Sequence, residues 1–242
     1  MRANYLKLAL VALAGVMLLG CTKKEKWIEL MREPNLASWR KDRGEWFEAG
    51  KAFMNPENEK LIATEPGRGV AVNGPTGRTK HLFTVLEHGD CELHVEFMVP
   101  NGSNSGVYLM GRYEVQVRDT WGVENPTSSD CGGIYQRWKD DKGFEGHAPR
   151  VNASLPAGQW QEYDIYFRAP RFDKNGDKTA NAKFIKVVHN GQLVQENVEV
   201  SGPTRSAAFR DELPLGPLML QGDHGPVAYR NVRIRPLKED AT

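Results

Sequence analysis

Three polar side chains able to do chemistry, Glu114, Gln116 and Arg118, alternate with apolar residues in the stretch YEVQVR at positions 113–118. In a β-strand, residues spaced by two point to the same face of the sheet. A carboxylate, an amide and a guanidinium along one face suit a polar, ring-shaped ligand such as a sugar. A solvated polar face, the more ordinary outcome for an amphipathic strand, remains the alternative.

Further polar and aromatic residues flank this stretch. Asn104 and Tyr108 precede it, and Asp119 and Trp121 follow it at once. Their number and closeness favour a ligand over a bare solvated face, so we expect the strand to form the floor of a groove.

A second candidate for acid and base chemistry is His224. The motif LQGDHG places an Asp-His pair directly after an apolar run that ends in Gln221. A histidine beside a carboxylate at the mouth of a sheet suits proton transfer, whereas a turn histidine that binds backbone is equally compatible with the sequence. The long segment 136–159 carries Trp138 and is either an aromatic platform, a lid or a structured surface loop.

Other familiar site patterns are weak. The other histidines lack metal-ligand spacing, and the sequence has no Gly-x-Ser-x-Gly motif. The segment FDKNGDK at 172–178 has the acidic spacing of a calcium loop, but Phe184 stands where the bidentate glutamate belongs. Its Asn-Gly pair is more typical of a hairpin turn.

The elements that must position these residues are strands. Period-two runs are separated by Gly and Pro, HNGQ at 189–192 is a hairpin signal, and a short helix fits only 26–32. The runs cover residues 82–87, 91–99, 106–119, 160–168, 182–189, 193–200, 215–221 and 227–234. Many short strands without helical crossovers predict antiparallel sheets packed as a sandwich or jelly roll, in which one curved sheet offers a groove.

The N-terminal segment predicts export. A basic start, an apolar run at 8–19 and the sequence LLGC before Cys21 are typical of a bacterial lipoprotein signal. We therefore expect a signal peptide at 1–20, lipidation of Cys21, a tether at 21–27, one domain at 28–237 and a tail at 238–242. This organisation predicts a protein anchored by its lipid in the cell envelope, at the outer membrane and facing the periplasm or the surface. An ordinary secretory signal is the alternative.

The net charge argues against one class of partner, and the position of Cys91 argues against a disulfide. The formal net charge is +1 with a pI near 7.7, and the basic residues are scattered, so a nucleic-acid partner is not expected. Cys91 shares parity with Leu93 and Val95, which favours a free thiol in the core over a disulfide with Cys131.

Several motifs together resemble the 3-keto-disaccharide hydrolase family, a concanavalin-like jelly roll. They are NSGVYLMGRYEVQVRD, CGGIY, PAGQWQEYDIYF, the HNG hairpin, GPTR and GPLMLQGDHGPVAYRNVRIRPL. The resemblance runs from about residue 39 to residue 237. Arg118 stands where that family usually has an aliphatic residue, and Cys91 and the insertion after Tyr135 also depart from its pattern. These departures concern the choice of substrate more than the fold.

The resemblance implies an all-β sandwich of two antiparallel sheets with a concave groove, and cleavage of the glycosidic bond in glycosides oxidised to a ketone at the third sugar carbon. The ketone acidifies the neighbouring C–H bond, so a base can remove that proton before the glycosidic oxygen leaves. Glu114, His224 and Asp119 are the catalytic candidates, with Glu114 or His224 as the base and the other helping the leaving group. Either Arg230 or a bound divalent cation would hold the enolate, and no other cofactor is expected. The expected carbohydrate ligands are Asn104, Tyr108, Gln116, Arg118, Trp121, Tyr135, Trp138, Gln221 and Arg230.

Two other functions fit the same fold. A lectin-like module would bind sugars through Trp121, Trp138 and Tyr108 without chemistry. A conventional glycosidase would need two carboxylates that flank the bond, and the sequence offers no clear pair.

Overall fold

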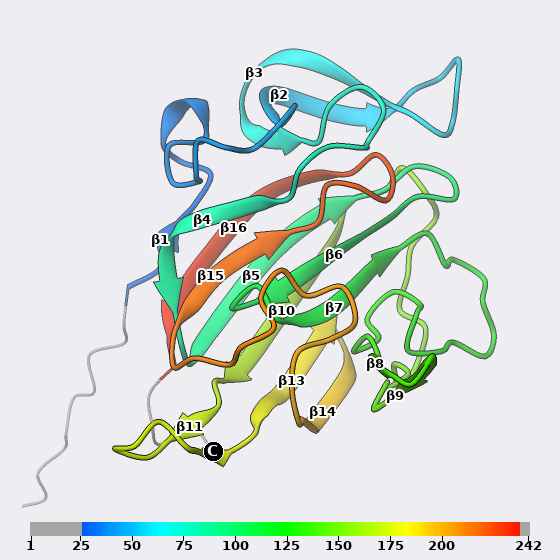
Figure 1. Cartoon of the computed structure of the whole chain (residues 1–242). Coiled ribbons are helices and arrows are strands. Elements are labelled where there is room, and N and C mark those ends of the chain that lie inside the picture. The colour runs from blue at the N-terminus through cyan, green and yellow to red at the C-terminus, as the bar shows by residue number, and fades with distance from the viewer. Residues whose placement is uncertain (1–25, 238–242) are drawn as a thin grey trace, which may run out of the picture.

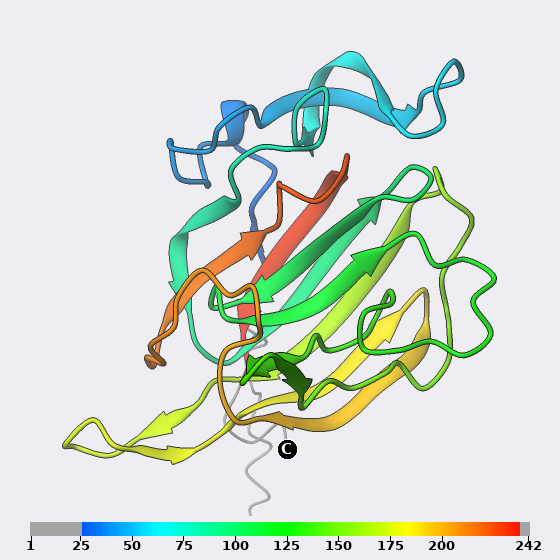
Figure 2. The same cartoon turned by 45° about the vertical axis from the view of Figure 1, so that its right-hand side comes forward.

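The computed structural model describes residues 26–237, which form two packed antiparallel sheets (Figures 1 and 2). This architecture confirms the predicted all-β jelly-roll sandwich. The signal peptide, the lipidation site Cys21, most of the tether and the C-terminal tail lie outside the described residues. No helix among residues 26–237 is long and apolar enough to cross a membrane.

The larger sheet has eight strands in the order β14-β13-β10-β5-β16-β3-β2, with β1 paired to β16 at one end. Its strands are β1 (Ile28–Glu29), β2 (Phe47–Met54), β3 (Ile62–Val72), β5 (Cys91–Met98), β10 (Gln161–Arg168), β13 (Ala182–His189), β14 (Gln192–Val200) and β16 (Ala228–Pro236).

The smaller sheet has four strands in the order β4-β15-β6-β7, and Figure 1 shows it lying across the larger sheet. Its strands are β4 (Leu82–His88), β6 (Asn104–Leu109), β7 (Tyr113–Arg118) and β15 (Gly216–Leu220). Two small hairpins and one 3-10 turn complete the described secondary structure, namely β8 (Arg137–Lys139) with β9 (Lys142–Phe144), β11 (Arg171–Phe172) with β12 (Lys178–Ala180), and η1 (Pro34–Leu36).

The core lies between the two sheets. In β7, the apolar residues Tyr113, Val115 and Val117 are fully buried within it. Tyr229 of β16 crosses the core, and its hydroxyl lies 2.8 Å from the Ser105 hydroxyl of β6. Because successive strand residues point to opposite faces, the residues of β6 and β7 that alternate with the core are turned to the outer face of the smaller sheet. The predicted alternation of YEVQVR is thus confirmed.

Several predicted elements need correction. The run 106–119 is two strands, because Met110 and Gly111 have φ values of 55° and 66° and turn the chain back between β6 and β7. The helix expected at 26–32 is wrong, since that segment contains strand β1, which pairs with β16. Strands β2 and β3 were not expected, because Gly50 and Gly67 interrupt their alternation; these two glycines pack so closely that a β-carbon on Gly67 would lie 2.6 Å from the Gly50 Cα.

The remaining local predictions have clear outcomes. The HNG hairpin connects β13 and β14, and the segment 172–178 is a hairpin turn in which the Asp173 carboxylate accepts hydrogen bonds from the backbone of Asn175 and Asp177. Cys91 and Cys131 are both buried free thiols, so no disulfide joins them.

Candidate active site on the outer face of the smaller sheet

Strands β6, β7 and β15 bring together five of the predicted site residues on one surface. Tyr108 and Glu114 are direct partners in the β6–β7 register, and Gly106 pairs with Gln116 one step along. The backbone N–H of Gln221, just beyond β15, donates to the Gly106 carbonyl on the other side of β6. The expected groove floor is therefore a continuous surface on three neighbouring strands.

This surface contains polar atoms that the protein itself leaves unpaired. Asn104 Oδ1, the Tyr108 hydroxyl, Glu114 Oε2, Gln116 Oε1 and Gln221 Oε1 are buried and have no hydrogen-bond partner among the described residues. A buried polar atom without a partner costs free energy, and nearly all such atoms in folded proteins are paired. Their concentration on one face indicates a ligand that supplies several hydrogen bonds, as a sugar with its hydroxyl groups does.

Glu114 is one of the two most buried of these groups, together with Tyr108. It is 1% exposed, and its carboxyl leans over Gly106, where a β-carbon would stand 2.3 Å from Oε1. The absence of a side chain at Gly106 makes room for this carboxyl. Burial raises the pKa of Glu114 to about 8, the Asp223 carboxylate raises it further, and the nearby Tyr108 hydroxyl acts in the opposite direction.

The loop that follows β15 carries the second catalytic candidate and is held firmly in place. The amide of Asn73, at the end of β3, donates to the carbonyls of Gly222 and Gly225 at 3.1 and 2.8 Å and accepts from the Val227 N–H at 2.8 Å. On the other side, Gly77 packs so closely that a β-carbon there would lie 2.0 Å from the Pro226 nitrogen. These contacts fix both ends of the loop that contains Asp223 and His224.

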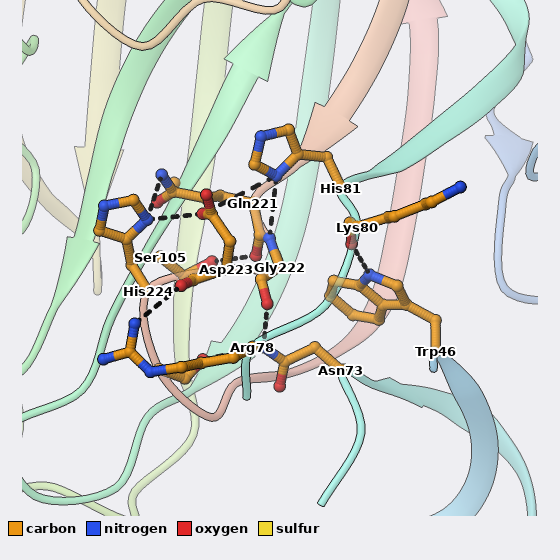
Figure 3. Close-up of polar contacts among 12 residues, drawn as sticks. Trp46, Asn73, Arg78, Lys80, His81, Ser105, Gln221, Gly222, Asp223 and His224 are labelled. Carbon is orange, nitrogen blue, oxygen red and sulfur yellow. Dashed lines mark hydrogen bonds and ion pairs between the residues drawn. The ribbon is translucent and has the colours of Figure 1, made fainter. Parts of the chain in front are cut away.

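Within this loop, the Asp223 carboxylate lies between two imidazole rings (Figure 3). His224 Nδ1 is 2.5 Å from Asp223 Oδ1 and 3.2 Å from the Gln221 amide nitrogen, and His81 Nδ1 is 3.9 Å from the same carboxylate oxygen. A proton on His224 Nδ1, donated to Asp223, leaves Nε2 of that ring free to accept a proton. The Asp-His pair thus has the arrangement of a base with its orienting carboxylate.

The imidazole of His81 carries its proton on a different nitrogen from that of His224. Its Nδ1 accepts a hydrogen bond from the Gly222 N–H at 3.3 Å, so a neutral ring carries its proton on Nε2. Burial lowers the pKa of His81, Asp223 opposes that change and His224 adds to it. His81 is therefore neutral near pH 7 and presents a donor at the edge of the site.

Two predicted residues lie at the far end of β7. Arg118 is exposed and donates to the Ser129 carbonyl at 3.3 Å. Asp119 accepts a hydrogen bond from the Gly102 N–H at 2.8 Å, which ties two loops together. Asp119 therefore has a structural partner and stands apart from the Glu114 pair in the β6–β7 register.

The predicted aromatic residues border the surface to different extents. The Tyr135 N–H donates to the Glu114 carbonyl at 3.1 Å, so its segment runs alongside β7. Trp138 lies in the β8–β9 hairpin with the Arg205 guanidinium 3.7 Å from its ring centre. Trp121 is 62% exposed. The segment 136–159 is thus partly a hairpin, with one aromatic face already occupied by Arg205.

The prediction that Arg230 shares this groove is wrong. Arg230 lies in β16 of the larger sheet, binds Glu96 at 2.6 Å and stacks over Trp160 at 4.0 Å. Its neighbour Tyr229 takes the core-facing position, so Arg230 points to the outer face of the other sheet. It cannot hold an enolate formed near Glu114.

A group of side chains with metal-ligand chemistry also lies on that outer face. His94, Glu96 and Glu162 have ligand atoms within 4.8 Å of one another. Asp164 binds His94 at 2.8 Å, and Asn231 binds Glu96 at 2.7 Å, so two of the three side chains already have protein partners. The group is on the wrong face to supply the divalent cation considered for the groove.

Two residues of the site were missed as individual candidates. Asp223 was part of the recognised Asp-His pair, and its adjacency to His224 was the available signal. The sequence around His81 contains no such signal, because His81 precedes β4 and reaches Asp223 only through the pairing of β4 with β15.

Comparison with known proteins identifies the family of the chain. Residues 26–235 match the model of the 3-keto-alpha-glucoside-1,2-lyase-like domain. The chain belongs to this family. Membership confirms the resemblance seen in the sequence motifs and assigns the domain a carbohydrate-active function. Among curated proteins, none matches the chain significantly.

Solved structures agree with this assignment. A protein of Parabacteroides distasonis ATCC 8503, provisionally described as a glycosyl hydrolase, is 25% identical, with a TM-score of 0.62 over 87% of this chain and 84% of that chain. A second such protein from the same organism is 21% identical, with a TM-score of 0.56 over 88% of this chain and 100% of that chain. The second likeness supports the fold alone.

Proposed function

We propose that this domain cleaves the glycosidic bond of 3-keto glycosides or 3-keto disaccharides, by removal of the proton next to the ketone. The observation that carries the proposal is the set of unpaired buried polar atoms on the outer face of β6, β7 and β15, beside the oriented His224. The matched family, named for a 3-keto-glucoside lyase, supports the same substrate class. The glycosyl hydrolase relatives support action on a glycosidic bond in general.

The geometry suits this reaction in physical terms. A ketone at the third carbon makes the hydrogen on the second carbon acidic enough for an imidazole or carboxylate to remove it. The resulting enolate expels the oxygen substituent at the first carbon, and water then adds to the double bond. Such a route needs one base and a site for the enolate oxygen, which the His224 and Glu114 regions can provide.

A conventional glycosidase is the second candidate, and one observation favours it. The Asp223 charge raises the pKa of Glu114, so a second carboxylate lies near the first. Inverting and retaining glycosidases both use two carboxylates. Asp223, however, is bound to His224 at 2.5 Å, which gives it an orienting role in place of a nucleophilic one.

Paired substrates test the proposal. We expect the purified domain to release the aglycone from a 3-keto glucoside and to leave the matched unoxidised glucoside intact, because only the ketone makes the neighbouring proton acidic. Product release is followed by chromatography, and binding of both compounds by calorimetry. Equal cleavage of both substrates would support the glycosidase, and binding without turnover of either would support a lectin-like module.

A further inference from the structure

Tyr108 and Glu114 form a buried pair of groups on the site face whose roles the reaction outlined above leaves open. They stand directly opposite each other in the β6–β7 register and are 0% and 1% exposed. Both lean over Gly106, where a β-carbon would lie 2.3 Å from Glu114 Oε1 and 2.8 Å from Tyr108 Cε2. The two side chains therefore converge on one small volume above β6.

Neither group has its polar end satisfied. The Tyr108 hydroxyl and Glu114 Oε2 are both buried without a hydrogen-bond partner among the described residues. A carboxylate in such surroundings would pay a large desolvation cost, whereas a protonated carboxyl is neutral. Burial raises the pKa of Glu114 to about 8 and that of Tyr108 well above its ordinary value, so both groups keep their protons near pH 7.

The surrounding titratable groups do not reverse this state. Asp223 opposes ionisation of both side chains, and burial keeps His81 neutral near pH 7. The other titratable or charged groups on neighbouring elements are Tyr135, Tyr229, His224 and Arg118.

A protonated carboxyl and a phenol are each hydrogen-bond donors. The two groups interact with each other, since the Tyr108 hydroxyl lowers the pKa of Glu114, and neither has any other acceptor among the described residues. Two such donors side by side and buried match an oxygen atom on which negative charge develops. A tyrosine beside a carboxylic acid held neutral by its apolar site is an established way to stabilise an enolate, as in ketosteroid isomerase.

We propose that Glu114 and Tyr108 donate the two hydrogen bonds that hold the enolate oxygen, and that His224, oriented by Asp223, is the base. This inference rests on the proposed function and assigns Glu114 a role different from that of a base.

His224 Nε2 takes the hydrogen from the second sugar carbon as a proton, and the electrons of that C–H bond form a double bond to the third carbon. The carbonyl oxygen becomes the enolate oxygen, which accepts from Glu114 and Tyr108. As the carbonyl re-forms, the electrons of the double bond between the second and third carbons form a double bond between the first and second carbons. The bond between the first carbon and the glycosidic oxygen breaks, its electrons leave with that oxygen, and the protonated His224 gives its proton to it.

Two substitutions separate this role from that of a base. Glu114→Gln keeps a donor at the same place, so turnover of a 3-keto glucoside at pH 7 should fall by no more than about tenfold. Tyr108→Phe removes one donor and should lower kcat by about a hundredfold or more with little change in KM. A loss of a hundredfold or more in folded Glu114→Gln, together with near-normal activity of Tyr108→Phe, would overturn the inference.

The pH dependence of turnover distinguishes this role of Glu114 from a purely structural one, which would not change it. Turnover by the wild type should decline above about pH 8, as Glu114 loses its proton, and this decline should be absent in Glu114→Gln. Infrared difference spectra should show a protonated carboxyl band at pH 7 that disappears with Glu114→Gln. Absence of that band would overturn the inference even in an active enzyme, whereas a wild type that shows the band but cleaves no 3-keto glucoside would refute the proposed function.

Discussion

Substitution of His224 by Asn is expected to lower kcat for a 3-keto glucoside by about a thousandfold, because it removes the group that takes the proton. The Asn side chain cannot accept a proton near neutral pH, and no other described imidazole contacts Asp223 as closely. The His224 side chain is about half exposed, so the melting temperature should change by no more than a few degrees. Steady-state kinetics and thermal melts of the same preparations check both statements.

Two further variants, one at Asp223 and one at a surface aspartate, serve as comparisons for His224→Asn. Asp223→Asn should reduce kcat less than His224→Asn, since it weakens the orientation of the base and leaves the base present. Asp42→Asn is the control, because Asp42 is an exposed carboxylate whose partner is Lys80 at 2.6 Å. If His224→Asn retains more than half of the wild-type kcat, His224 is a turn residue and another group is the base.

The second large effect concerns stability. Glu114→Gln is expected to make the protein several kcal/mol more stable than the wild type at pH 8 to 9. The folded-state pKa of Glu114 is about 8, against an ordinary value of 4.5, so between these pH values the folded protein holds a proton that the unfolded chain has released. Stability of the wild type therefore falls as pH rises through this window, by about 1.4 kcal/mol for each pKa unit of difference. Gln does not titrate and lacks this loss.

Urea denaturation at several pH values between 4 and 9 measures the difference. The two free energies of unfolding should change with pH in parallel below about pH 4.5 and diverge above it, with the variant the more stable. Glu65→Gln is the control for the loss of one carboxylate, because Glu65 is half exposed beside Lys51. Parallel curves for wild type and Glu114→Gln across the whole range would contradict the buried, protonated state of Glu114.

Local alternation was enough to predict the central part of the site. Glu114 and Gln116 face outward because Val115 and Val117 occupy the core, and this two-residue period is visible in the six residues YEVQVR. The Asp-His pair in LQGDHG, directly after an apolar run, was the second local signal, and the structure holds that loop beside β6. These features depend on near neighbours in the chain or on motifs.

The prediction that Arg230 lies in the groove was wrong because it depended on which sheet its strand joins. Arg230 follows the same alternation, but β16 pairs with β5 and β3 in the larger sheet, and its register shifts between Arg230 and Arg233. His81 and Asp223 meet across 142 positions of sequence because β4 pairs with β15. Long-range pairing of this kind leaves no local period, so it could not be derived from one sequence.

The fate of the hydrogen on the second sugar carbon tests the central claim most directly. A 3-keto glucoside is cleaved by the enzyme in heavy water, and the product is analysed by NMR, with unreacted substrate and product alone incubated as exchange controls. We predict that the second carbon of the product carries deuterium after hydration, or no hydrogen at all if the unsaturated ketone is released. Complete retention of the original hydrogen in the cleaved product would show that no proton is removed beside the ketone and would contradict the account.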